Sequence, residues 1–198
     1  IGLVNAYVTI DQFERIPFGV DVLFQTNDGW KLGIEICEDL WAVIPPSSSQ
    51  SLNGANVIAN LSASNDLVGK SKYRRDLVAQ QSARCVVGYI YSSSGEGESS
   101  TDNVYSGHRL IADNGKILQE TEDYYSDSSV IYADLDLTAL QHDRFKNSSF
   151  TESASSHHVR ISSITMSKGP NKAIKLTAPQ RFPFVPSNTD DRIEVCNR

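Results

Sequence analysis

One cysteine and two acids follow an apolar stretch in the segment Gly33-Ile-Glu-Ile-Cys-Glu-Asp-Leu-Trp41. Such a run is typical of a buried strand, and reactive groups often lie on the turn that leaves a rigid element. Cys37 is therefore a candidate nucleophile, with Glu38 and Asp39 beside it. A lone strand cysteine is more commonly a small buried hydrophobe, and a thiol becomes a nucleophile only near a base or a cation. The local sequence leaves both interpretations open.

The composition argues against several classes of function. At 198 residues the chain is long enough for one sizeable core and short for two domains. The net charge of -6, with no concentration of Lys and Arg beyond Lys70 to Arg75, argues against nucleic acid as the main partner. No apolar stretch approaches membrane-spanning length, so we expect no membrane partner.

The three cysteines are widely spaced and odd in number: Cys37, Cys85 and Cys196. They match neither a disulfide framework nor a Cys-x-x-Cys metal site, which favours a reducing, cytoplasmic setting. His157-His158 resembles a metal pair only superficially, because no further His or Cys is close in sequence. We therefore predict no metal site. The chain begins without an initiator methionine, which suggests a cut rather than a natural start.

One hairpin and two helices are expected around the cysteine. Strands Asp21 to Gln25 and Trp30 to Cys37 are joined by the turn Asn27-Asp28-Gly29. Ser47 is expected to cap a short helix running toward Asn53, and a strand follows at Val57 to Leu61. A helix is predicted over Lys70 to Cys85, and it leads into a strand at Val86 to Tyr91. Its apolar side is predicted from Leu77, Val78, Ala83 and Tyr73, and its outer side from Lys72, Arg74, Arg75 and Gln80.

The second half of the chain is predicted to hold more strands and polar connections. Ser92 to Asp102 is too polar and glycine-rich for a core, so it is a loop over a site or a linker. Asp136 is expected to cap a helix that ends near Phe145. The remaining predictions are strands at 107–112, 116–120 and 130–135, a turn at 113–115, a polar linker at 146–156, an edge strand at 158–167 and an extended segment at 181–186. This order favours a mixed sheet with helices on its outer face.

Five further segments are considered together: Glu35 to Trp41, Pro45 to Ser47, Ala59 to Ser64, Gln81 to Cys85, and the loop Gly95-Glu-Gly-Glu-Ser99. Together they resemble the glutaminase domain of the glutamine-dependent NAD(+) synthetase family. The cysteine turn alone resembles the wider carbon-nitrogen hydrolase (nitrilase) superfamily, whereas the Gly-Glu-Gly-Glu-Ser loop and Pro183-Phe-Val-Pro186 resemble this synthetase. The likeness is dense from about Pro17 to Gly115. It implies an α/β fold, the nitrilase-like four-layer αββα sandwich, with its C-terminal two-thirds present.

This resemblance implies a Glu-Lys-Cys triad, in which Cys37 matches the nucleophile. Its thiol would attack the side-chain amide of glutamine, release ammonia and leave a thioester for water to hydrolyse. The backbone N–H of Glu38 would donate to the oxyanion. In the family, ammonia travels to a second site that binds ATP and Mg²⁺ and amidates deamido-NAD to NAD.

The base glutamate and the triad lysine of the family belong to motifs upstream of the cysteine, and this sequence holds neither motif. Glu14, Lys31 and Glu35 are the only Glu or Lys residues before Cys37, and none matches. No Ser-Gly-Gly-x-Asp-Ser loop of a synthetase domain occurs either. We therefore expect an interior segment, inactive by itself and without a cofactor of its own. Residues 1–150 would be the partial hydrolase domain, and 151–198 its end and a linker toward an absent synthetase domain.

Four further residues match positions expected near glutamine. Glu38 is assigned to the substrate ammonium, although a buried pair with Arg84 or Lys70 is the alternative. Trp41 is assigned to the pocket wall. Ser64 and Lys70 are assigned to the α-groups of the substrate, with a turn serine and a solvated lysine as the alternatives.

Two other acids lie in the glycine loop, Glu96 and Glu98. Because they lie in a glycine loop with no histidine near, a structural or domain-communicating loop is favoured over acid/base chemistry or metal binding. The resemblance implies that this loop lies close to the glutaminase site and the interface, where Glu98 and Asp102 would relay occupancy between domains. The rival functions are a stand-alone amidase or carbamoylase, and a noncatalytic assembly module in which the cysteine is core. Family members build homo-oligomers, so an interface is also expected.

Overall fold

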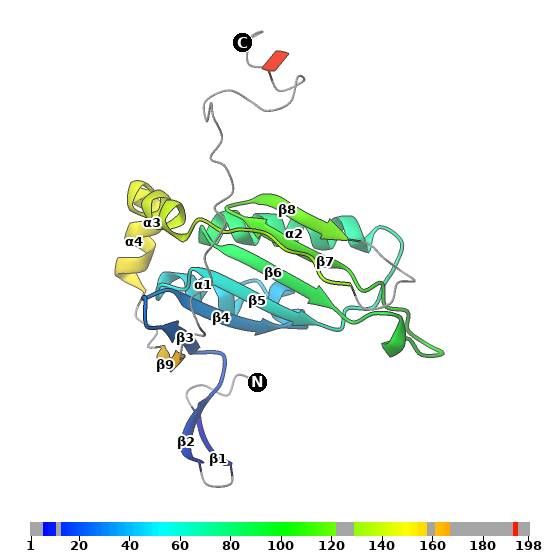
Figure 1. The fold of residues 1–198 in the computed structure, drawn as a ribbon, viewed down its shortest axis with the longest axis horizontal. Helices are drawn as coiled ribbons and strands as arrows, with labels where there is room; N and C mark the ends of the chain where they lie inside the picture. The colour runs from blue at the N-terminus through cyan, green and yellow to red at the C-terminus, as the bar shows by residue number, and fades with distance from the viewer. Residues whose placement is uncertain (1–5, 11–12, 122–128, 158–160, 167–191, 194–198) are drawn as a thin grey trace.

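The structure is a computed structural model that describes residues 6–10, 13–121, 129–157, 161–166 and 192–193. Seven strands form one mixed sheet in the order β8-β7-β6-β5-β4-β3-β9 (Figure 1). Strands β4, β5 and β6 are parallel to one another, as are β3 and β9, and the other neighbours are antiparallel. The strands are β3 Val22–Thr26, β4 Lys31–Ile36, β5 Val57–Ser62, β6 Gly88–Ser93, β7 Arg109–Asp113, β8 Lys116–Thr121 and β9 Ser162–Met166.

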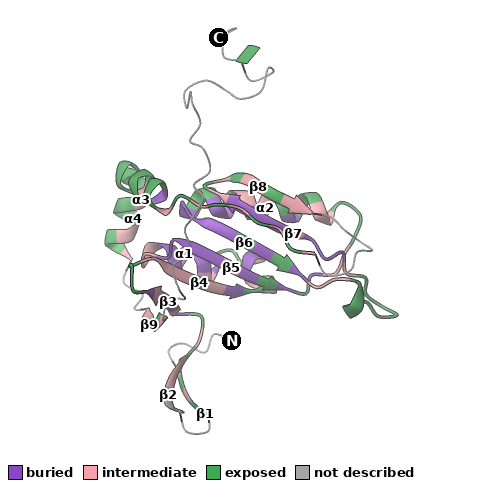
Figure 2. Ribbon diagram, viewed as in Figure 1, coloured by how far each residue is buried: buried purple, intermediate pink, exposed green. Residues whose placement is uncertain are grey.

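Helices α1 and α2 pack together on one face of this sheet. The helices are α1 Pro46–Leu52, α2 Lys70–Cys85, α3 Leu137–Lys146 and α4 Ser148–Ser156, with short 3₁₀ helices η1 Cys37–Trp41 and η2 Glu96–Glu98. A separate hairpin pairs β1 Ala6–Ile10 with β2 Phe13–Phe18. Parallel strands joined by helices bury the central strands, and Figure 2 shows β5 and β6 as the most buried part of the sheet. The predicted α/β class with a mixed sheet and an outer helical layer is confirmed.

The two faces of the sheet differ sharply in exposure. On the helical face Ile58 and Tyr89 are completely buried, because α1 and α2 cover them. On the opposite face Ile36, Leu61 and Ile90 remain 63%, 57% and 37% exposed. The described residues therefore supply one sheet and one helical layer of the layered sandwich, and they leave an apolar sheet face uncovered.

Three predictions about local structure were wrong. Ser47 does not cap the short helix: Pro45 is the N-cap and Ser47 lies inside α1, where its N–H is bonded to a buried carboxylate of β4. Residues 130–135 form no strand, although their exposure alternates, because no neighbouring strand pairs with them. The supposed polar linker 146–156 contains α4, which Asn147 caps by accepting a hydrogen bond from Phe150 N at 3.0 Å.

The helix α2 has the predicted bounds but not the predicted faces. Arg74 was expected outside and is fully buried, since it pairs with polar groups beneath the helix. Tyr73 and Ala83, expected on the apolar side, are exposed, whereas Val78 is buried as predicted. Helical periodicity marks a buried face, but it does not show that a charged residue has buried partners. The Asp136 cap of α3 and the edge position of β9 are confirmed, and the predicted extended segment at 181–186 lies outside the described residues.

Candidate active site

Cys37 stands where β4 ends and η1 begins, in a left-handed backbone conformation with φ of 50°. Non-glycine residues rarely adopt this region, and the strain of roughly 1–3 kcal/mol persists only where the surroundings impose it. Here the Asp39 carboxylate accepts a 2.7 Å hydrogen bond from Ile36 N, and Leu40 is buried in the core. The chain changes direction sharply at Cys37, which is partly exposed, and does not continue along β4.

All five residues predicted for the site line one hollow of about 520 Å³. Cys37, Glu38 and Trp41 come from η1, Ser64 follows β5, and Lys70 opens α2. Because β4 and β5 are parallel neighbours, the segments that leave them emerge at the same edge of the sheet. Ser64 is 6% exposed, whereas Glu38 is exposed to solvent. The structure brings the predicted residues together without assigning their roles.

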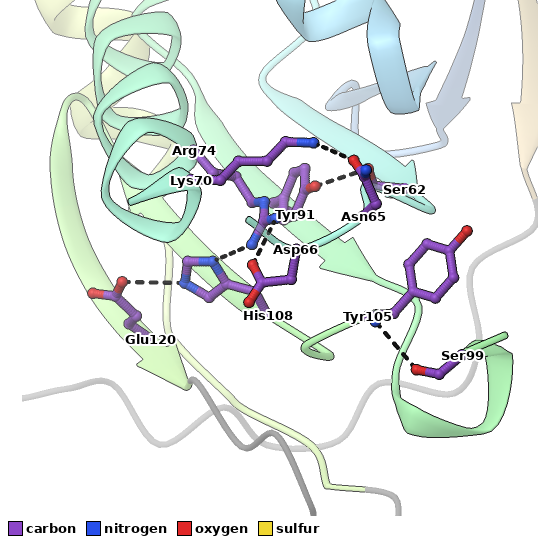
Figure 3. A network of polar contacts seen from close by, with 10 residues as sticks. All are labelled: Ser62, Asn65, Asp66, Lys70, Arg74, Tyr91, Ser99, Tyr105, His108 and Glu120. Atoms are coloured by element: carbon purple, nitrogen blue, oxygen red, sulfur yellow. Dashed lines mark hydrogen bonds and ion pairs between the residues drawn. The ribbon is translucent and has the colours of Figure 1, made fainter. Parts of the chain in front are cut away.

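Lys70 is held in place by a side chain of the same hollow. Its Nζ donates a 2.6 Å hydrogen bond to Asn65 Oδ1, and Asn65 also lines the hollow (Figure 3). Glu38 and Arg84 are both exposed, so the alternative of a buried pair between Glu38 and Arg84 or Lys70 is not found. Lys70 lines the same hollow as the buried Ser64. A cation together with a hydroxyl group is a suitable site for a carboxylate.

Two further residues of the lining, Asn103 and Tyr105, were missed by sequence reasoning. They follow the polar loop, which is folded back on itself: Ser99 Oγ accepts from Tyr105 N at 3.2 Å, and Ser100 Oγ accepts from Asn103 N at 3.2 Å. Asp66 N donates to Val104 O at 2.7 Å and ties this wall to the segment after β5. The segment that follows the loop therefore forms part of the wall of the hollow, whereas no residue of the loop at 92–102 lines it. The polar composition of the loop was the only signal of this wall in the sequence.

The acids of the glycine loop do not line the hollow. Glu96 and Glu98 form η2 and are exposed, away from the lining residues. Their proposed relay role, with Asp102, stays a prediction.

A buried ionic network lies behind the wall made by Asn65 and Lys70 (Figure 3). Arg74 Nη1 donates to His108 Nδ1 at 3.0 Å, and its Nη2 lies 3.6 Å from Asp66 Oδ1. His108 Nε2 lies 3.1 Å from Glu120 Oε1. Because Arg74 can only donate, His108 must carry its proton on Nε2 and donate it to Glu120. The network fastens α2, the segment after β5 and the start of β7 to one another.

The two charged residues of the cysteine's own strand are bonded elsewhere. Lys31 Nζ donates to Asn53 O at 3.3 Å. Glu35 is buried, and its carboxylate accepts from Ser47 N at 2.9 Å and from the Tyr89 hydroxyl. Burial and the Glu35 charge raise the pKa of Tyr89 well above its ordinary value, so this hydroxyl keeps its proton. Neither Lys31 nor Glu35 reaches the thiol as a base, and Cys37 Sγ has no hydrogen-bond partner among the described residues.

Among the described residues, no histidine and no cysteine besides Cys37 lines this hollow. His157 Nε2 lies 2.8 Å from Ser49 Oγ, Cys85 is buried in the core, and His158 and Cys196 lie outside the described residues. Among the residues that the structure describes, no group of three or more metal-ligating side chains occurs. Within the same residues, no helix is both long and apolar enough to cross a bilayer.

No family model matches the chain. A glutamine-dependent NAD(+) synthetase of Mycobacterium leprae is 35% identical over 189 residues, which cover 92% of this chain and 28% of that protein. The glutamine-dependent NAD(+) synthetase structure from Cytophaga hutchinsonii is 33% identical with a TM-score of 0.50, covering 60% of this chain and 18% of the other.

The wider superfamily shares the fold. A carbon-nitrogen hydrolase structure from Helicobacter pylori covers 62% of this chain and 45% of its own at a TM-score of 0.52, with 17% identity. The present chain spans little more than a quarter of the length of the mycobacterial relative. Over that span it belongs to the family of glutamine-dependent NAD(+) synthetases, in a segment with a nitrilase-superfamily fold.

Proposed function

We propose that this chain is the glutamine-hydrolysing part of a glutamine-dependent NAD(+) synthetase, with Cys37 as its nucleophile. The observation that carries the proposal is the hollow of about 520 Å³, in which a strained cysteine faces a lysine, a glutamate and a buried serine. An amino acid needs an anion for its ammonium and a cation or donors for its carboxylate. Glu38 would serve the first and Lys70 with Ser64 the second, while Trp41 would form an apolar wall.

In the proposed reaction the Cys37 thiolate attacks the side-chain amide carbon of glutamine. The tetrahedral oxyanion is stabilised by the Glu38 N–H, ammonia leaves with the proton given up by the thiol, and a glutamyl thioester remains. Water then cleaves the thioester and releases glutamate. The ammonia would be used to amidate deamido-NAD at an ATP- and Mg²⁺-dependent site that lies outside these 198 residues.

The proton transfer needs a base that the described lining does not provide at the thiol. Besides Cys37, its titratable side chains are Glu38, Lys70 and Tyr105, and none of them is hydrogen-bonded to Cys37 Sγ. We therefore expect the 198 residues by themselves to be inactive, and the full natural chain to be active. A cytoplasmic homo-oligomer is part of the same proposal by analogy with the family.

The test is labelling by a glutamine-shaped diazo-ketone, with the modified cysteine located by mass spectrometry. Cys85 is the matched control thiol, because it is 2% exposed and burial raises its pKa. In the full natural chain, Cys37 should be labelled selectively, glutamine should protect it, and Cys37→Ser should abolish ammonia release. Equal, slow labelling of both thiols with no protection by glutamine would refute the proposal and favour a noncatalytic module.

A further inference from the structure

The strained backbone at Cys37 rests on a directional chain of buried hydrogen bonds. Asn60 Nδ2 lies 3.5 Å from Cys37 O and 3.3 Å from the Tyr89 hydroxyl oxygen. Tyr89 donates in turn to Glu35, whose other carboxylate oxygen accepts from Ser47 N. Glu35, Asn60 and Tyr89 come from the adjacent strands β4, β5 and β6, and each is at most 1% exposed.

The direction of every bond in this chain is fixed by its chemistry. The Glu35 carboxylate can only accept, so the Tyr89 proton points to it and the Tyr89 lone pairs remain for a donor. The Cys37 carbonyl can also only accept. Asn60 must therefore turn its NH₂ group toward both, which leaves its Oδ1 buried without a partner among the described residues. A buried amide oxygen without a partner costs stability. The orientation of the Asn60 amide is therefore imposed by its hydrogen-bond partners, the Cys37 carbonyl and the Tyr89 hydroxyl.

The same peptide group connects this chain to the hollow. In a trans peptide the C=O and the following N–H point in opposite directions, and no described peptide is cis. With Cys37 O directed at Asn60, the Glu38 N–H points away from Asn60. Glu38 is the second residue of η1, so its N–H is one of the groups that a helix start leaves without an intrahelical acceptor.

We infer that Asn60 and Tyr89 are positioning residues, which hold the Cys37–Glu38 peptide so that its N–H is aimed at the oxyanion formed on the substrate of Cys37. This inference deepens the proposed function and rests on it. Glu35 anchors the chain by accepting from Tyr89 and thereby orienting its hydroxyl. None of the three side chains lines the hollow, so they act through the peptide and not on the substrate.

The test uses Asn60→Asp and Tyr89→Phe in the full natural chain. Aspartate keeps the shape of asparagine and replaces the donor by an oxygen that repels Cys37 O, whereas phenylalanine removes only the hydroxyl. Tyr91→Phe is the matched control, because Tyr91 is a buried tyrosine on the same face of β6 that donates to Ser62 Oγ at 2.8 Å instead. Active sites are counted by diazo-ketone titration, so that misfolded molecules do not enter the rate.

Because an oxyanion donor acts in the transition state, each test variant should lower kcat per titrated site at least tenfold and leave KM within twofold. Tyr91→Phe should stay within twofold in both. The double variant Asn60→Asp/Tyr89→Phe should lie within about threefold of Asn60→Asp alone, since both changes break one chain. Rates per site equal to those of Tyr91→Phe, or fully additive losses, would overturn the inference.

A second readout separates this inference from the proposed function. The Glu38 ¹⁵N amide chemical shift responds to the hydrogen bond that the preceding carbonyl accepts, so it should move in both test variants and stay fixed in Tyr91→Phe. If the wild-type protein releases no ammonia from glutamine, the proposed function fails. In that case the Glu38 amide shift alone tests whether Asn60 and Tyr89 hold the Cys37–Glu38 peptide. An unchanged shift in both variants would show that they do not hold it.

Discussion

Arg74 Nη1 lies 3.0 Å from His108 Nδ1, and neither side chain is exposed to solvent. Arg74 is one helical turn after Lys70, so the residue that lines the hollow and the residue buried behind it share one side of α2. The pair joins this helix to the start of β7, and Asp66 joins it to the segment after β5. Two walls of the candidate site are thus fixed by one buried cation.

Replacing Arg74 should lower the free energy of unfolding of the protein. In Arg74→Met the largely buried Asp66 carboxylate and the buried His108 ring lose their cationic and donor partner, which costs about 3–5 kcal/mol. Urea denaturation measures the change in the free energy of unfolding. The control is Arg75→Met on the next residue, whose ion pair with Glu120 is partly exposed, at 45% and 24% of the two side chains, and should be worth less than about 1 kcal/mol. Equal losses in the two variants would contradict the buried network.

Removing the charge of Lys70 should weaken substrate binding more than it slows the reaction. If Lys70 pairs with the substrate carboxylate, Lys70→Met loses a charge-assisted bond of about 1.5–3 kcal/mol, and KM for glutamine should rise at least tenfold. The expected change in kcat is smaller than threefold. Lys72→Met serves as the control, since Lys72 points into solvent and pairs with Asp76. An unchanged KM would leave Lys70 as a support for Asn65 only.

Asp113 should destabilise the folded protein at neutral pH. Burial, with the charges of Asp136 and Asp143, raises the pKa of its carboxyl above 3.8. Between 3.8 and the raised pKa the folded state binds more protons than the unfolded state, so stability falls as the pH rises through this window. Asp113→Asn should therefore raise Tm at pH 7, by the equivalent of roughly 0.5 kcal/mol for this partly exposed group.

The pH series supplies the check on Asp113. The advantage of Asp113→Asn should shrink as the pH is lowered toward 4, because the wild-type carboxyl then takes up its proton in the folded state before it does so in the unfolded state. Scanning calorimetry from pH 8 to 4 measures it, with Asp102→Asn in the exposed loop as the control. A gain that persists unchanged at pH 4 would show that the charge of Asp113 is not its cause.

Arg144 should hold α3 against the ends of the sheet. Its guanidinium donates to Val86 O at 3.1 Å, Ala55 O at 2.5 Å and Cys85 O at 3.2 Å, and burial lowers its pKa to about 10, so it is charged at neutral pH. Arg144→Met should cost about 2–4 kcal/mol, since three carbonyls lose a charged donor. Lys146→Met, on the exposed side of the same helix, should cost less than about 0.5 kcal/mol. Hydrogen exchange should show α3 opening first in Arg144→Met only.

The sequence by itself determined the elements that local signals control. Turn residues at 27–29 and 113–115 marked two hairpins, Asp136 marked the start of α3, and apolar runs marked the central strands. Polar composition also identified the loop after β6. Each of these features depends on neighbours within a few residues, so a linear pattern is sufficient to predict it.

Only the tertiary structure decided which polar side chains are buried and what they meet. Arg74 has the residue type of a solvated helix position, and Glu35 that of an exposed strand position. Both are nevertheless buried, because Arg74 contacts His108 next to β7 and Glu35 contacts Tyr89 of β6. Asn103 and Tyr105 reach the hollow through backbone bonds to serines of a loop without periodicity. In the left-handed turn at Cys37, the carbonyl oxygen likewise contacts Asn60, which is 23 residues away. Contacts of this kind arise from the pairing of strands, and no spacing within the chain encodes them.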